Sequence, residues 1–281
     1  MFERLSRSWQ LVKASASVLR QDTQLLLFPL ASFLALVLVV LAFAVPVFGL
    51  GLLEQVSRDH VPASGYVVAF LFYFVQYFVI FFFNAGLVGA AMMRLDGGEP
   101  TFADGMRIAT ARIGVIAGYA AIAATVGVIL RAIQERVGFI GRIIVGLLGV
   151  GWSIATYLVV PVLVVRDVGP VDAVKESALL LKKTWGENLI GQAGLATAFA
   201  FIFVAVIFAG VFLSLVAAMG HSIGLFVTAL VLTVLALGLT ALVQSALAGI
   251  YEAALYRYAT TGQAALGFDS ETLQLAFRRK K

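Results

Sequence analysis

Four amide side chains and one carboxyl group stand inside the long apolar stretches of this chain, and their types make them the best candidates for chemistry there. They are Gln76, Asn84, Gln192, Gln244 and Glu252. Acids held among apolar residues at membrane depth are costly and often serve as ion or proton sites, which makes Glu252 the first candidate. The four amides are compatible with a solute path. They are equally compatible with packing, because interhelical hydrogen bonds between such groups contribute about 1 kcal/mol each.

Glu252 also has a simpler interpretation. Tyr256, Arg257 and Tyr258 follow it closely, and aromatic and basic residues gather where a helix leaves the bilayer. In that case Glu252 already lies among lipid headgroups and pairs with a basic neighbour. The sequence leaves both interpretations open.

Other groups that support catalysis are scarce. There is no cysteine, which excludes disulfides and thiolate metal sites, and the two histidines, His60 and His221, lack a zinc-binding spacing. No phosphate-binding loop, serine elbow or carboxylate pair is apparent, and Gly86-x-x-Gly89 predicts helix packing. We therefore expect no catalytic residue, no metal and no cofactor, and predict that the protein is not an enzyme.

The elements that must hold these polar groups are six long apolar runs. The chain is 62% hydrophobic and only 12% charged, with a mean hydropathy of +1.02, whereas soluble domains carry about 25% charged residues. Runs of roughly 20 apolar residues are long enough to cross a bilayer. The sequence thus predicts an all-α polytopic membrane bundle with spans at 25–53, 66–93, 113–130, 143–165, 189–218 and 223–256.

The third predicted span is the weakest. It is short, and the loop after it carries Arg131, Arg136 and Arg142. If this hairpin did not cross the bilayer, the chain would have four spans.

Basic residues alternate between the segments that connect the runs. Of the 20 lysines and arginines, 16 fall in every second segment, and such residues are retained on the cytoplasmic face. We therefore predict a bacterial inner-membrane protein with both termini in the cytoplasm. Because the basic residues lie beside the spans, we expect anionic lipid headgroups as partners and no nucleic acid.

A short amphipathic segment precedes each pair of spans, so the single membrane domain, 1–281, divides into three similar units. We expect an interfacial helix at 1–24 before hairpin 25–93, then units at 99–165 and 170–258, and a cytoplasmic tail at 259–281. Trp9, Phe102 and Trp185 lie on the apolar faces of the three segments as predicted interfacial anchors. Thr101 and Asp104 have the spacing of a helix capping box.

Prolines predict irregular points within the spans. Pro29, Pro46 and Pro161 each remove one backbone donor, and the carbonyl freed in this way needs a partner from a neighbouring helix or water.

Several stretches resemble a family of bacterial six-span membrane proteins with a domain of unknown function. They include Val160-Pro161 through Pro170, Lys183-Thr-Trp185-Gly-Glu-Asn188, Phe83-Asn84-Ala85, Leu27-Phe28-Pro29-Leu30 and Leu255-Tyr256-Arg257-Tyr258. The helix-entry motif is also loosely similar to membrane domains attached to some glycerophosphodiester phosphodiesterases. The resemblance implies a six-span fold in an inner membrane and supplies no catalytic residue.

Two functions are compatible with this pattern. The first is a non-catalytic scaffold or accessory factor in envelope or lipid organisation; the second is a permease or channel for a small solute or lipid, since transporters often combine repeats with broken helices. Convergence of the four amides on one polar cavity would favour transport, and separate pairing would favour the scaffold. The sequence is also compatible with a homo-oligomer. The Gly114-x-x-x-Gly118 motif, however, favours packing within one chain over a contact between two copies.

Overall fold

The fold was obtained as a computed structural model that describes residues 2–49, 63–183, 185–220 and 222–262. The described chain is helical and contains no strand, so the all-α prediction is confirmed. Six of its helical segments are long and apolar enough to cross a membrane. The elements in chain order are α1 (Phe2–Gln21), η1 (Thr23–Leu26), α2 (Leu27–Gly49), α3 (Ala63–Leu95), α4 (Phe102–Ala111), α5 (Ile113–Arg136), α6 (Phe139–Ala155), α7 (Val159–Val165), α8 (Pro170–Lys183), α9 (Trp185–Met219) and α10 (Ile223–Thr261).

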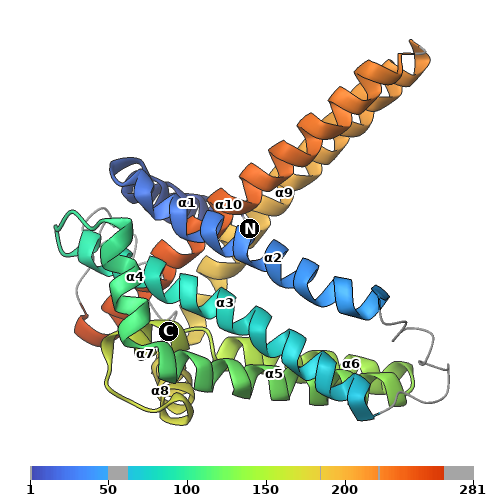
Figure 1. Cartoon of the computed structure of the whole chain (residues 1–281). Coiled ribbons are helices and arrows are strands. Elements are labelled where there is room, and N and C mark those ends of the chain that lie inside the picture. Colours follow the sequence, from blue (N-terminus) through green and yellow to red (C-terminus); the bar gives the residue numbers. More distant parts are fainter. Residues whose placement is uncertain (1, 50–62, 184, 221, 263–281) are drawn as a thin grey trace.

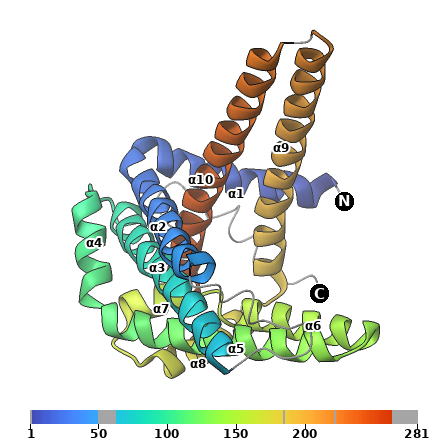
Figure 2. The ribbon, with the colours of Figure 1, turned by 45° about the vertical axis from the view of Figure 1, so that its right-hand side comes forward.

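The short helices α1, α4 and α8 gather at one end of the molecule, and the long helices run away from them (Figure 1). The α9–α10 hairpin diverges from α2, α3, α5 and α6, as both views show (Figures 1 and 2). We call the end that contains α1, α4, α7 and α8 the closed half, and the diverging ends of the long helices the open half. Each of α1, α4 and α8 comes directly before a pair of apolar helices, as predicted.

The hydrophobic core belongs to the closed half. It is built from 85–95 of α3, 116–124 of α5, 158–163 around α7 and 246–256 of α10, with contributions from α1, η1 and α8. In the open half, large apolar side chains point outward, and Phe208 of α9 and Leu239 of α10 are 71% and 64% exposed. Such a surface is stable in lipid and unstable in water, which agrees with a multi-pass membrane protein.

The third span is longer than the sequence pattern indicated. Helix α5 continues past Arg131 to Arg136, which makes it 24 residues and about 36 Å long. The Arg131 guanidinium pairs with Glu135 (Nε to Oε1, 3.1 Å) and donates to the Tyr73 hydroxyl, so its charge is partly compensated within the protein. The hairpin is therefore long enough to cross, which supports six spans rather than four.

The fourth span is interrupted at 156–158, between α6 and α7. Residue 157, in the middle of the interruption, is four positions before Pro161. A proline clashes with the carbonyl four positions earlier and leaves it without a donor, so a helix breaks near this point. Ser177 of α8 repairs the break: its hydroxyl donates to Ala155 O (2.7 Å) and accepts from Leu158 N–H (3.0 Å). The irregularity predicted at Pro161 is present, but the carbonyl that Pro161 itself frees is that of Tyr157, so a partner for this carbonyl stays a prediction. By contrast, Pro29 lies in the first turn of α2, and α2 is one helix through Pro46.

Glycines bring the helices of the closed half into close contact. A Cβ at Gly105 of α4 would lie 2.3 Å from Phe28 Cζ and 2.6 Å from Gly86 O, and a Cβ at Gly89 would lie 2.9 Å from Ile108. Gly86-x-x-Gly89 is therefore a packing motif, as predicted. Gly118 likewise packs against Pro170 within the chain, while Gly114 has open space beside it.

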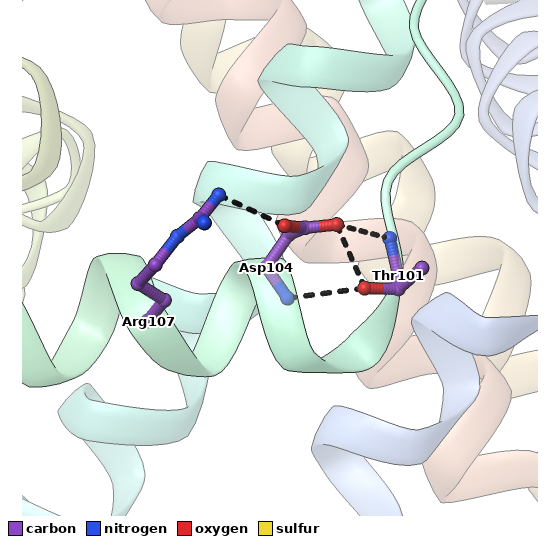
Figure 3. Close-up of polar contacts among 3 residues, drawn as sticks. All are labelled: Thr101, Asp104 and Arg107. Carbon is purple, nitrogen blue, oxygen red and sulfur yellow. Dashed lines mark hydrogen bonds and ion pairs between the residues drawn. The ribbon is translucent and has the colours of Figure 1, made fainter.

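Helix α4 begins with the predicted capping box (Figure 3). The Asp104 carboxylate accepts from the Thr101 hydroxyl (2.7 Å) and backbone N–H (3.0 Å), and the Thr101 hydroxyl accepts from Asp104 N–H (3.2 Å). Arg107 Nη2 lies 2.9 Å from Asp104 Oδ1. These hydrogen bonds from Thr101, more than the charge of Arg107, lower the pKa of Asp104 from its ordinary value.

Candidate functional site: a buried carboxyl–amide pair between two cavities

The larger of two cavities near the centre of the molecule has a volume of about 890 Å³ and is partly open. Helices α3, α5, α6, α7, α9 and α10 all contribute to its wall. It follows α5 from Tyr119, in the closed half, to Leu130, in the open half. Eleven residues separate these two positions, so the cavity is about 16 Å long in this direction.

A smaller cavity, of about 240 Å³, lies between α2, α3 and α10. Its wall includes Phe28, Ser32, Leu87 and Ser245. Asn84 and Glu252 line both cavities. These two side chains therefore form the polar boundary between the cavities.

The pair itself is a hydrogen bond across two helices. Asn84 Nδ2 of α3 donates to Glu252 Oε2 of α10 at 3.2 Å, and Glu252 is only 7% exposed. Within the part of the chain that the structure describes, the second carboxylate oxygen has no hydrogen-bond or ion-pair partner, and Glu252 lines both cavities. It is therefore free to bind a group that enters a cavity.

The local sequence explains why α3 and α10 meet here. Gly249 lies one turn before Glu252, and a Cβ at this position would come within 2.4 Å of Leu87 Cδ2 and 3.3 Å of Asn84 Oδ1. Alanines surround the pair on both helices, with Ala85, Ala253 and Ala254 fully buried. Small residues allow helix backbones to approach closely, which brings the short side chain of Asn84 within reach of Glu252.

The wall of the larger cavity is mostly apolar, with aromatic rings near Glu252. Phe81 and Tyr119 have ring centroids 4.5 Å apart, and Tyr77 stacks on Phe81 at 5.7 Å. Tyr157 and Trp152 complete this aromatic part of the wall, and Thr156 lies beside the Tyr119 hydroxyl. Among the described lining residues, Glu252 is the sole charged group. A partly open, largely apolar cavity with few polar groups at one end is suited to binding an amphiphile.

The structure brings together two of the five polar residues that the sequence singled out. Gln76 and Gln244 are half-buried and line neither cavity, and the side chain of Gln192 lies outside the described residues. The predicted alternative for Glu252, pairing with a basic neighbour, is wrong, because its partner is Asn84. Arg257 binds Asp96 and the Leu95 carbonyl instead.

Sequence reasoning missed the aromatic and glycine residues of the cavity. Tyr119 and Tyr157 carry hydroxyls within apolar runs, and this could have indicated that they line a cavity. Tyrosines are also common at the ends of spans, so the pattern did not single them out. Gly127 and Gly149 leave space in the wall. The Tyr77 hydroxyl packs against Gly127, and a Cβ at Gly149 would meet only Leu130, 3.9 Å away.

The predicted interfacial anchors are only partly described. Phe102 is half-buried and packs on Phe28, with ring centroids 4.7 Å apart, so this ring contributes to protein packing between α4 and α2. The side chains of Trp9 and Trp185, like His60 and His221, lie outside the described residues. Their role at the lipid headgroups stays a prediction.

The fold and the buried pair define a multi-pass helical membrane protein with an internal cavity. The chain belongs to the family of unknown function DUF6159, whose model matches residues 63–267. This range includes both halves of the Asn84–Glu252 pair and all of α4 to α10. A comparison with curated proteins gives no match.

Proposed function

We propose that this protein is a non-catalytic accessory factor in lipid organisation that holds one amphiphilic molecule from the bilayer in its larger cavity. The observation that carries the proposal is the polarity of the cavity. Its inner end has Glu252, Asn84 and the hydroxyls of Tyr119 and Tyr157, whereas the wall toward Leu130 is mostly apolar and has the Tyr77 hydroxyl beside Gly127. An amphiphile would place its polar group at the inner end and its chain toward the open half.

The surroundings of the cavity support entry from the membrane. The outer wall belongs to α5 and α6, whose neighbouring side chains Ile129, Leu147 and Leu148 are 52%, 65% and 58% exposed. In a bilayer these side chains contact acyl chains, so an amphiphile need not cross water to reach the cavity.

A non-catalytic role agrees with the groups available around the pair. Glu252 is the only carboxyl group among the described residues that line either cavity. Acid–base catalysis needs positioned groups whose pKa lies near the operating pH, and the other titratable groups of the larger cavity wall are tyrosine hydroxyls. Asn84 offers hydrogen bonds without exchanging a proton.

The direct test is a cavity-filling substitution. In Gly149→Leu the new side chain would enter the larger cavity, and we expect the affinity for the amphiphile that copurifies with the protein to fall about tenfold or more, because the space is filled. Native mass spectrometry from mild detergent measures the retained molecule. Gly151→Leu is the matched control, since this position is on the same helix, is exposed, and has no neighbour within 4 Å. Equal retention in wild type and Gly149→Leu would contradict the proposal.

A permease is the second candidate, and one observation favours it. Asn84 and Glu252 line both cavities, so movement of one side chain would join the two spaces. Solute flux into proteoliposomes that is lost in Asn84→Leu and kept in Gln244→Leu would support transport through this boundary. Flux equal to that of empty liposomes would leave the accessory role as the better explanation.

We further propose a bacterial inner-membrane location with both termini in the cytoplasm, contacts to anionic headgroups, and no nucleic-acid partner. The support is the alternation of basic residues along the chain. Trp9, Phe102 and Trp185 are the proposed anchors, and self-association is proposed as an option. A reporter fused after Lys281 that is active only on the far side of the membrane would refute this orientation.

A further inference from the structure

We propose that the amphiphile held in the larger cavity carries a protonated amine, with the Glu252 carboxylate as its countercharge and the surrounding aromatic rings as its cage. This inference rests on the proposed function and adds the chemical class of the ligand.

The first argument is the missing countercharge. A carboxyl group taken out of water is ionised only beside a cation or with several hydrogen bonds, and Glu252 has one hydrogen bond, from an uncharged amide. Three arginines of the closed half pair with other acids: Arg112 with Asp167 (2.6 Å), Arg166 with Glu176 (3.0 Å), and Arg257 with Asp96. A ligand cation would supply the partner that the described protein does not.

The second argument is the aromatic wall. Tyr77, Phe81, Tyr119, Trp152 and Tyr157 line the same cavity as Glu252. Ring faces attract cations, and the attraction increases when water is excluded. A carboxylate within a set of aromatic rings is a recurrent arrangement for binding ammonium groups.

The third argument concerns what the cavity would reject. Among its described lining residues there is no lysine or arginine. A headgroup whose only charge is a phosphate or carboxylate would place a negative charge beside Glu252, with no positive charge from the lining residues to compensate it. Anionic amphiphiles are therefore excluded from the inner end, although they remain suitable neighbours for the basic outer surface.

Fluorescence of Trp152 provides the test. The protein has three tryptophans, so Trp9→Phe with Trp185→Phe leaves Trp152 as a reporter in the cavity wall. We would place this protein in phosphatidylglycerol nanodiscs, whose headgroup carries no ammonium group, and titrate a brominated alkylamine and the brominated alcohol of equal chain length. We expect the amine to quench at a concentration about tenfold lower than the alcohol, and Glu252→Gln to remove this difference, since glutamine keeps the hydrogen-bonding shape and loses the charge.

The outcomes separate the two proposals. Equal quenching by amine and alcohol, unchanged in Glu252→Gln, would overturn the amine while leaving amphiphile binding intact. Quenching that is unaffected by Gly149→Leu would overturn both. Competition by phosphatidylethanolamine would identify a lipid as the source of the amine, and its absence a free alkylamine. Native mass spectrometry of the unaltered protein with the same two probes repeats the comparison without the tryptophan substitutions.

Discussion

The two ends of α10 show how differently the two halves of this molecule are built. From Ala246 to Tyr256 nearly every residue is buried, and the buried side chains are 0–7% exposed. Most large side chains from Ile223 to Leu239 are instead about half exposed or more. In the first segment Gly249 packs against Leu87 and Asn84 of α3, and in the second Thr233 packs against Gly210 of α9. The closed half therefore depends on closely fitted side chains from several helices, while in the open half close packing is between α9 and α10, as at Gly210 and Thr233, and the outer faces depend on solvation by lipid.

The difference also explains where the candidate site lies. Two helices that approach closely enough to bury a carboxyl–amide pair need small residues at the contact, and Gly249 and the alanines of α3 and α10 provide them. Where the helices diverge, the larger cavity remains unfilled. The site is thus at the transition from the closed half to the open half.

The largest effect is expected at Ser177, which holds the interrupted fourth span. Ser177→Ala would leave Ala155 O and Leu158 N–H without partners in the buried core, and we expect a loss of about 2–4 kcal/mol in the free energy of unfolding. Ser153→Ala is the control, because that exposed hydroxyl only donates to Gly149 O in its own helix (3.0 Å). Its effect should stay within about 0.5 kcal/mol. SDS titration in mixed micelles measures the free energy of unfolding of both variants. Equal values for Ser177→Ala and Ser153→Ala would show that Ser177 of α8 does not stabilise the break between α6 and α7.

A glycine pair on α10 compares the two halves directly. Gly249→Ala would press against Leu87 and Asn84, and we expect it to cost about 1–3 kcal/mol through overpacking. Gly238→Ala, in the open half, meets no atom within 4 Å and should be neutral or stabilise by up to about 1 kcal/mol, because alanine favours the helix. The same SDS titration applies. Similar costs at both positions would mean that the open half is as tightly packed as the closed half.

The smallest effect is expected at the start of α4, on the surface of the closed half. The pKa of Asp104 is lowered in the folded protein, so its ionised form stabilises α4 above the ordinary value of 3.8, and this contribution is lost as the pH falls through the lowered pKa. Asp104→Asn should therefore lower the unfolding temperature slightly at pH 7 and have no effect in strong acid. Arg107→Met should keep most of this pH dependence, since Thr101 provides the main hydrogen bonds. If the difference in unfolding temperature between wild type and Asp104→Asn were the same at every pH, the ionised Asp104 carboxylate would not be the group that stabilises α4.

Local patterns predicted much of the architecture. The six apolar runs, the capping box at Thr101 and Asp104, the packing role of Gly86 and Gly89, and the irregularity at Pro161 all follow from residue type and spacing. The end of the third span did not, because three arginines suggested a boundary that α5 passes with the help of Glu135 and Tyr73. The pairing of Arg131 with Glu135, four residues later in α5, could be read from the sequence, whereas the hydroxyl that Tyr73 brings from α3 could not.

The sequence by itself determined that this chain is an all-helical membrane protein and that Asn84 and Glu252 are polar groups placed within apolar helices. Both conclusions depend on the composition of single segments, since a run of apolar residues needs lipid whatever its neighbours are. Only the tertiary structure decided that these two residues, 168 positions apart, form one hydrogen bond, and that Gln76 and Gln244 take no part in lining the cavities. The reason is geometric: partner choice depends on which helices approach closely, and that depends on glycines and alanines distributed over several segments.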